Sequence, residues 1–190
     1  SIKTLASYAL NLEDHYKTPV DIEWAIDKEG NIFLLQCRPL MVEEISRPKG
    51  IENLNYPLLI DSGTLACKGI AVGKACLVSK EEDLEKFPQG SVLIASQPSP
   101  TFVRIMDRAR AIVTDFGSTT GHMASIAREF RIPALLNAKD ATKIIHSGQE
   151  ISVDCFNAKV YEGIIPEFLG LETKRESFIK NTPTYSLLQE

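Results

Sequence analysis

The sequence predicts an α/β protein in two unequal parts, and three observations support this prediction. Apolar residues recur at helical spacing over about the first fifteen residues. Two strand-like runs follow, "DIEWAI" and "NIFLLQCRPL". From about residue 58 to about residue 165, apolar runs typical of strands alternate with short helical patterns. Strands mixed with helices in this way indicate an α/β or α+β fold.

The first part ends in a predicted β-hairpin, because Pro19 ends the helix and "DKEG" (Asp27 to Gly30) supplies a turn. With a four-residue turn, Glu23 faces Leu34, and Glu23 and Gln36 become diagonal neighbours roughly 7 to 8 Å apart. A metal ion can bridge that gap. Side chains alternate between faces along a strand, so one polar face is expected to hold Asp21, Glu23, Gln36 and Arg38.

The stretch "EEISRPKGIENLNYP" (Glu43 to Pro57) has the composition of a linker. We therefore place a domain boundary near residue 50 and expect domains at residues 1–47 and 48–165. The polar stretch 166–190 is expected to connect to further sequence. The absence of an initiator methionine also suggests a piece of a longer chain.

The second part is predicted to contain four strand-like runs before a final hairpin: "GIAVGKACLVS", "GSVLIAS", "RAIVTD" and "IPALLNA". Ser99 and Pro100 have the residue types of an N-cap and a first helical position, so a helix is expected there. The run "KEEDLEKF" is expected to form a solvated helix face. "EISVDC" and "KVYEGII" are expected to pair across Phe156 and Asn157.

Composition limits the class of protein. Of 190 residues, 44% are hydrophobic and 24% charged, which is ordinary for a soluble globular protein. The net charge of -4 argues against a nucleic-acid partner. The four cysteines lack zinc-site spacing and indicate buried thiols in a reducing cytoplasm. The sequence has no secretory signal and no apolar run of about 18 residues, so neither export nor membrane insertion is predicted.

His122 is the residue that the helical pattern singles out. On a helix beginning there, Met123, Ile126, Ala127 and Phe130 form a core-facing stripe, and His122 lies at its N-terminal flank. Unpaired N–H groups and a partial positive charge at this end attract phosphate and disfavour a protonated imidazole. Both effects favour phosphotransfer. The dipole contributes only about 1 kcal/mol, so the pattern alone also allows a capping or packing histidine.

Two separate stretches resemble the phosphoenolpyruvate-utilising enzymes. "TDFGSTTGHMASIAREFRIPAL", with "SGQEISVDCFNAKVYEG", resembles their swivelling phosphohistidine domain, a β/β/α fold. "DIEWAIDKEGNIFLLQCRPL" resembles the last hairpin of the ATP-grasp domain that precedes it in phosphoenolpyruvate synthase (pyruvate, water dikinase). Both occur here in the family's order.

The resemblance implies a role for each candidate residue. His122 would be the phosphocarrier, with Thr120 and Arg128 in its phosphate-binding shell. Glu23 and Gln36 would hold magnesium and ATP phosphates, and Arg38 would contact a phosphate. The expected enzyme is a pyruvate, water dikinase-like phosphotransferase that uses ATP and Mg²⁺, with domain movement hinged in the linker and the tail. The chain alone is expected to be inactive without the other domains of its parent.

Three residues depart from the family's pattern, and alternatives follow. Ser118 replaces a glycine, Gly121 replaces a small polar residue, and Asn137 replaces a glycine. One alternative keeps the phosphohistidine but delivers to an antibiotic, a phenol or a glucan. Another is a non-catalytic docking module. His15 is expected at the surface, His146 in a structural turn, and Trp24 on the buried face of the hairpin.

Overall fold

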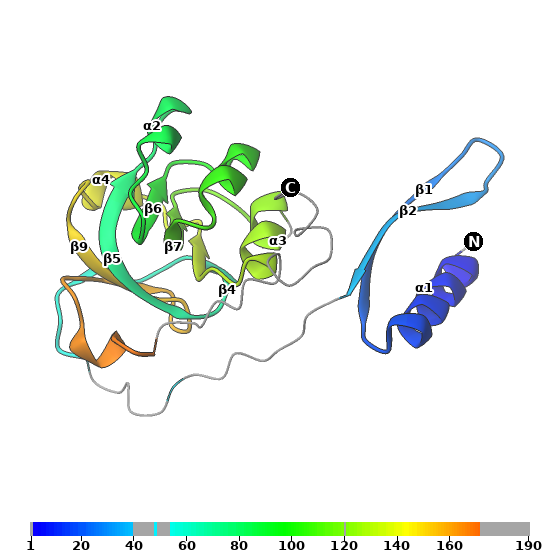
Figure 1. Cartoon of the computed structure of the whole chain (residues 1–190), viewed down its shortest axis with the longest axis horizontal. Helices are drawn as coiled ribbons and strands as arrows, with labels where there is room; N and C mark the ends of the chain where they lie inside the picture. Colours follow the sequence, from blue (N-terminus) through cyan, green and yellow to red (C-terminus); the bar gives the residue numbers. More distant parts are fainter. Residues whose placement is uncertain (1, 40–47, 49–53, 120, 172–190) are drawn as a thin grey trace, which may run out of the picture. The chain divides into compact units, whose positions relative to one another are not determined.

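The computed structural model describes residues 2–39, 48, 54–119 and 121–171, and the side chains of Arg38 and Pro39 are not among them (Figure 1). The chain divides into two compact units, Ser1–Glu44 and Ile45–Glu190. Most of the predicted linker, residues 43–57, falls outside the described residues.

The first unit contains a helix and a hairpin, as predicted. Helix α1 (Ile2–Tyr16) packs against the antiparallel strands β1 (Val20–Ile26) and β2 (Ile32–Pro39). None of its described residues is buried. The expectation that Trp24 fills a buried face is wrong, because 46% of this residue is exposed and the described part of the unit has no core to receive it.

The predicted register of the hairpin is also wrong. Oδ1 of Asp27 accepts the backbone N–H of Asn31 at 2.7 Å, which keeps Asn31 in the turn, so Ile26 pairs with Ile32. A bulge between Glu23 and Trp24 shifts the register once more, and Glu23 therefore pairs directly with Gln36.

The second unit is built on an eight-stranded mixed sheet with the order β3-β10-β9-β5-β6-β7-β8-β4. Strands β5 to β8 run parallel to one another, and the remaining pairings are antiparallel. The strands are β3 (Leu58–Ile60), β4 (Thr64–Cys67), β5 (Ile70–Leu77), β6 (Ser91–Ala95), β7 (Ala109–Thr114), β8 (Ala134–Leu136), β9 (Glu150–Asp154) and β10 (Lys159–Glu162). The mixed α/β fold and the closing hairpin β9–β10 are confirmed.

Alternation along the parallel strands gives the sheet two buried faces. Leu93 of β6 and Ile112 of β7 pack with helices α2 (Glu82–Glu85), η1 (Pro100–Ile105) and α3 (His122–Glu129). The neighbours Val92 and Val113 lie in a second cluster with α4 (Ala141–Ile144) and strands β9 and β10. A sheet covered on both faces explains why β6 and β7 are almost continuously apolar.

Two segments of the second unit differ from the prediction. The helix after Ser99 is a 3₁₀ helix, and Ser99 caps it as expected by accepting the N–H of Thr101 at 3.3 Å. Beyond residue 165, a second 3₁₀ turn, η2 (Pro166–Phe168), buries Phe168 completely. The packed unit therefore continues a few residues into the stretch expected to be a connector.

Candidate active site

His122 lies at the start of α3, in the segment that follows the carboxyl end of β7. We call residues 115–121 the histidine loop, of which Thr120 lies outside the described residues. The stripe predicted for α3 is confirmed: Met123, Ile126 and Ala127 are buried, while His122 is exposed. Packing of the stripe therefore fixes the helix and leaves the histidine at its open end.

The N terminus of α3 carries no side-chain cap. Its N-cap is Gly121, with φ of -73° and ψ of 158°. The first N–H groups of a helix have no partners within it, so this end presents donors and a partial positive charge beside His122. Within the described residues no hydrogen bond or ion pair holds the imidazole of His122. Among the residues that the structure describes, none therefore caps the helix start or holds the ring.

Arg128 holds the histidine loop from the far end of α3. Its guanidinium donates to the carbonyl of Thr119 through both terminal nitrogens, each at 3.3 Å, and to the carbonyl of Ala66 at 3.2 Å. Nη2 also lies 3.5 Å from Oγ of Ser125. Arg128 thus links the loop, β4 and α3. The sequence could not indicate this, because carbonyl partners leave no side-chain signal.

Asp115 anchors the first residue of the loop. It is 5% exposed, and its carboxylate accepts the backbone N–H of Thr142 at 2.9 Å and the Thr142 hydroxyl at 2.6 Å. Its own N–H donates to the carbonyl of Ala95 at 3.1 Å. Asp115 was not among the predicted site residues, although an acid directly after a buried strand is a usable signal in the sequence.

Asn137 fits the loop conformation despite replacing a glycine. Its φ is 55°, in the left-handed region that asparagine tolerates better than most residues. The next N–H, of Ala138, donates to the carbonyl of Thr114 at 2.8 Å. The connection beside the histidine loop therefore keeps its hydrogen bond. Gly117 lies close by with φ of 141°, and a Cβ there would come within 3.1 Å of Leu136 and Pro98.

The polar residues of the hairpin form the second predicted group. Glu23 and Gln36 are direct cross-strand partners, so both side chains leave the same face. Asp21 is paired with Arg38 along the backbone, but the side chain of Arg38 lies outside the described residues. Carboxylate and amide oxygens are ligands that Mg²⁺ accepts, and two neighbouring donors leave room for phosphate oxygens. The pair fits a magnesium–phosphate site.

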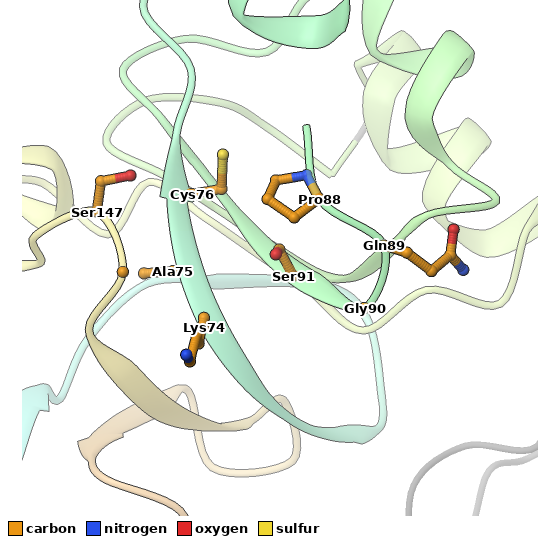
Figure 2. A pocket seen from close by; sticks show the side chains of 9 residues that line it. Lys74, Ala75, Cys76, Pro88, Gln89, Gly90, Ser91 and Ser147 are labelled. Carbon is orange, nitrogen blue, oxygen red and sulfur yellow. The ribbon is translucent and has the colours of Figure 1, made fainter. Parts of the chain in front are cut away.

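A hollow of about 460 Å³ lies elsewhere on the second unit (Figure 2). Lys74 and Cys76 of β5, Ser91 at the start of β6 and Ser147 are among its lining residues. Ser91 pairs with Ala109 at the start of β7, whereas the histidine loop follows the end of β7. The hollow therefore lies at the opposite end of the parallel strands, and no predicted site residue lines it.

The cysteine thiols belong neither to the residues around His122 nor to the polar residues of the hairpin. Cys67 and Cys155 are buried, and Cys37 and Cys76 are half-buried. Burial raises the pKa of the Cys67 thiol to about 11 and that of Cys155 well above its usual value. Among the described residues, no cluster of three acidic, cysteine or histidine side chains could hold a metal ion. In the same residues, no helix is long and apolar enough to cross a membrane.

Comparison with known proteins identifies the class. Residues 87–158 match the family described as PEP-utilising enzyme, mobile domain, and residues 1–55 match pyruvate phosphate dikinase, AMP/ATP-binding domain. The chain therefore carries a segment similar to a nucleotide-binding domain, followed by a segment similar to the mobile domain of the phosphoenolpyruvate-utilising enzymes.

Several relatives of the chain are named as phosphoenolpyruvate synthases. The chain is 36% identical over 174 residues to the phosphoenolpyruvate synthase of Neisseria meningitidis serogroup B, covering 86% of this chain and 22% of that one. It is 38% identical over 175 residues to that of Aeropyrum pernix, covering 86% and 21%. It is 35% identical over 162 residues to the probable phosphoenolpyruvate synthase of Pyrococcus horikoshii, covering 85% and 20%. The chain thus spans about a fifth of these relatives' length.

Among solved structures, the chain is similar to a solution structure of Enzyme I. The TM-score is 0.40 and the identity 19%, over 56% of this chain and 40% of that one.

Proposed function

We propose that this chain is part of a larger phosphotransferase that carries a phosphoryl group on His122 from ATP to pyruvate, as a pyruvate, water dikinase. The observation that carries the proposal is the exposed imidazole at an uncapped helix start, in a chain that also matches an AMP/ATP-binding domain. The family relationship and the relatives named phosphoenolpyruvate synthase support the choice of acceptor.

The first half-reaction consumes ATP and water and yields AMP, phosphate and phosphohistidine. A ring nitrogen of neutral His122 attacks the β-phosphorus in line, the bond between the α,β-bridging oxygen and the β-phosphorus breaks, and AMP leaves. Water cleaves the β,γ-linkage and releases inorganic phosphate. The ring N–H proton passes to solvent. In the second half-reaction the N–P bond breaks and the enolate oxygen of pyruvate takes the phosphoryl group.

The helix start supports both half-reactions electrostatically. Its first N–H groups, which have no partners within the helix, favour an anion on the ring nitrogen. Arg128 donates to the Thr119 carbonyl through both terminal nitrogens, which ties the histidine loop to α3. We place Arg128 in the site as the group that positions this loop. Thr120, the other expected member of the shell, lies outside the described residues.

On the nucleotide side, Glu23 and Gln36 would hold Mg²⁺ together with the ATP phosphates, and Arg38 would contact a phosphate. The ion supplies charge neutralisation of the triphosphate. This arrangement uses the face that direct pairing of Glu23 with Gln36 creates. We expect the isolated chain to be inactive, because one hairpin and one helix do not enclose a nucleotide.

The proposal is tested with the full-length parent protein and ATP labelled at the β-phosphate. The wild type should take up acid-labile label, and pyruvate should discharge it. His122→Ala should abolish labelling. His146→Ala is the matched control, because His146 is also exposed in the second unit and lies in a turn beside the hollow, away from the histidine loop.

Three other labelling results would contradict the proposal or part of it. Equal labelling of His122→Ala and the wild type contradicts the role of His122. Absence of label from every variant contradicts phosphotransfer and favours a docking module. Label that pyruvate does not discharge preserves the relay but contradicts pyruvate as acceptor.

A further inference from the structure

The buried carboxylate of Asp115 joins the histidine loop to α4. Its two oxygens accept the backbone N–H of Thr142 at 2.9 Å and the Thr142 hydroxyl at 2.6 Å. Thr142 is the second residue of α4, so its N–H is one of those that a helix leaves without an internal partner. The N-cap residue of α4, Asp140, provides no side-chain hydrogen bond. The cap of α4 therefore comes from the loop that carries the histidine.

The backbone beside this carboxylate is held as well. The N–H of Asp115 donates to the carbonyl of Ala95 at 3.1 Å, and its carbonyl accepts the N–H of Lys139 at 3.0 Å. The N–H of Phe116 donates to the carbonyl of Ser96 at 2.9 Å. The start of the histidine loop is thus fixed between the end of β6 and the segment that follows β8.

Asp115 and Arg128 hold the loop from opposite faces of the sheet. α4 packs through Ala141 in the cluster that contains Val92 and Val113. α3 packs in the cluster on the other face, and Arg128 ties the carbonyl of Thr119 to it. The loop is therefore anchored at its start by Asp115 and near its end by Arg128.

We propose that Asp115, held by Thr142, is a positioning residue for phosphotransfer through His122, a role that rests on the proposed function. It acts through the backbone of the loop, which leads directly into the first residue of α3. A fixed loop start keeps His122 in one place as the phosphoryl group arrives and leaves. Such placement matters because a shift of about 1 Å, even one caused away from the reacting atoms, can slow a reaction roughly 100-fold.

The test uses the full-length parent and ATP labelled at the β-phosphate. Asp115→Ala should lower the maximal labelling rate roughly 10- to 100-fold. The ATP concentration that gives half of this rate should stay unchanged, because the proposed ATP-binding residues lie in the first unit. Thr142→Val removes the hydroxyl and keeps the backbone N–H, so it should slow labelling by a smaller factor. Thr142→Ser keeps both hydrogen bonds and should label normally.

Asp154→Ala is the matched control for lost stability. Asp154 is 1% exposed, and its Oδ1 accepts the N–H groups of Phe156 at 2.8 Å and Asn157 at 3.2 Å. It pairs with Ile70 at the start of β5, and β5, β6 and β7 run parallel. Asp154 thus lies at the end of the sheet opposite the histidine loop. Its replacement should lower the melting temperature, as Asp115→Ala should, yet leave labelling normal below that temperature.

Three results would overturn the proposal. Normal labelling of Asp115→Ala while His122→Ala shows none would remove the positioning role and leave the proposed function intact. Equal slowing by Asp115→Ala and Asp154→Ala would make lost stability the cause. Equal rates for Thr142→Val and Thr142→Ser would exclude the link to Thr142, and this comparison decides if Asp115→Ala does not fold. Normal labelling of His122→Ala would instead contradict the proposed function itself.

Discussion

Arg128 holds the histidine loop through hydrogen bonds to backbone carbonyls. The resemblance places it in a phosphate shell, whereas its guanidinium is engaged by the carbonyls of Thr119 and Ala66. Arginine suits this task because its donors lie in a planar fork that reaches two acceptors together. Lysine would keep the charge and lose the fork.

We expect Arg128→Ala to lower the free energy of unfolding of the chain by about 1 to 2 kcal/mol, because two carbonyls lose a charged donor at a partly exposed site. Arg128→Lys should recover less than half of this loss. Urea denaturation measures both. Lys86→Ala, an exposed basic residue at the end of α2, is the control and should change stability little. Equal stability of Arg128→Ala and the wild type would contradict the loop-holding role.

At the scale of elements, α3 and α2 show what short helices need from their surroundings. α3 has eight residues and α2 has four, too few to be stable alone. Packing of Met123 and Ile126 fixes α3, and packing of Leu84 fixes α2. The start of α2 is further held by Asp83, whose Oδ2 accepts the N–H groups of Ser79 at 2.9 Å and Lys80 at 3.1 Å.

These two hydrogen bonds make the stability of α2 depend on pH. The bonds from Ser79, and then from Lys80, lower the pKa of Asp83 below its usual value. A depressed folded-state pKa contributes stability above the unfolded value of about 3.9, and this contribution is lost as the pH falls through the folded-state pKa. The melting temperature of Asp83→Asn should therefore lie below that of the wild type at pH 7, and the gap should shrink at pH 3.

Differential scanning calorimetry across this pH range checks the expectation. Glu85→Gln is the control, because Glu85 lies on the same helix and accepts no hydrogen bond in the part of the chain that is described. It should show no comparable gap. A gap for Asp83→Asn that stays constant from pH 7 to pH 3 would mean that the carboxylate charge is not responsible.

At the scale of the molecule, the two units differ in what holds them together. Every buried residue among those described lies in the second unit, between Ile60 and Phe168. The first unit leaves large apolar side chains exposed, including Leu35 at 66% and Phe33 at 51%. Hydrophobic burial is the dominant favourable term in folding, so the second unit should supply nearly all the stability of the chain.

We therefore expect residues 54–171 alone to unfold cooperatively at nearly the same temperature as the 190-residue chain. Residues 54–171 keep every buried residue that the structure describes. Calorimetry of both proteins tests this, and residues 1–39 alone should show no cooperative transition. Loss of cooperative unfolding from residues 54–171 would show that its core depends on the rest of the chain.

Local patterns in the sequence were sufficient to predict most helices and strands and to place His122 at the start of a helix. The stripe of α3, the cap at Ser99 and the hairpin β9–β10 depend on residues close together in the chain, and the structure confirms all three. The resemblance to the phosphoenolpyruvate-utilising enzymes is likewise confirmed by the family matches. The assigned roles of the candidate site residues all stay predictions: His122, Thr120, Arg128, Glu23, Gln36 and Arg38.

Only the tertiary structure decided the register of β1 with β2, the engagement of Arg128 by backbone carbonyls, and the hydrogen bonds between Thr142 and Asp115. Each depends on geometry that side-chain identity does not encode: a bulge, a carbonyl direction, or the approach of a helix from further along the chain. Residue types therefore determined which chemistry this protein can display, and packing decided which groups surround the histidine.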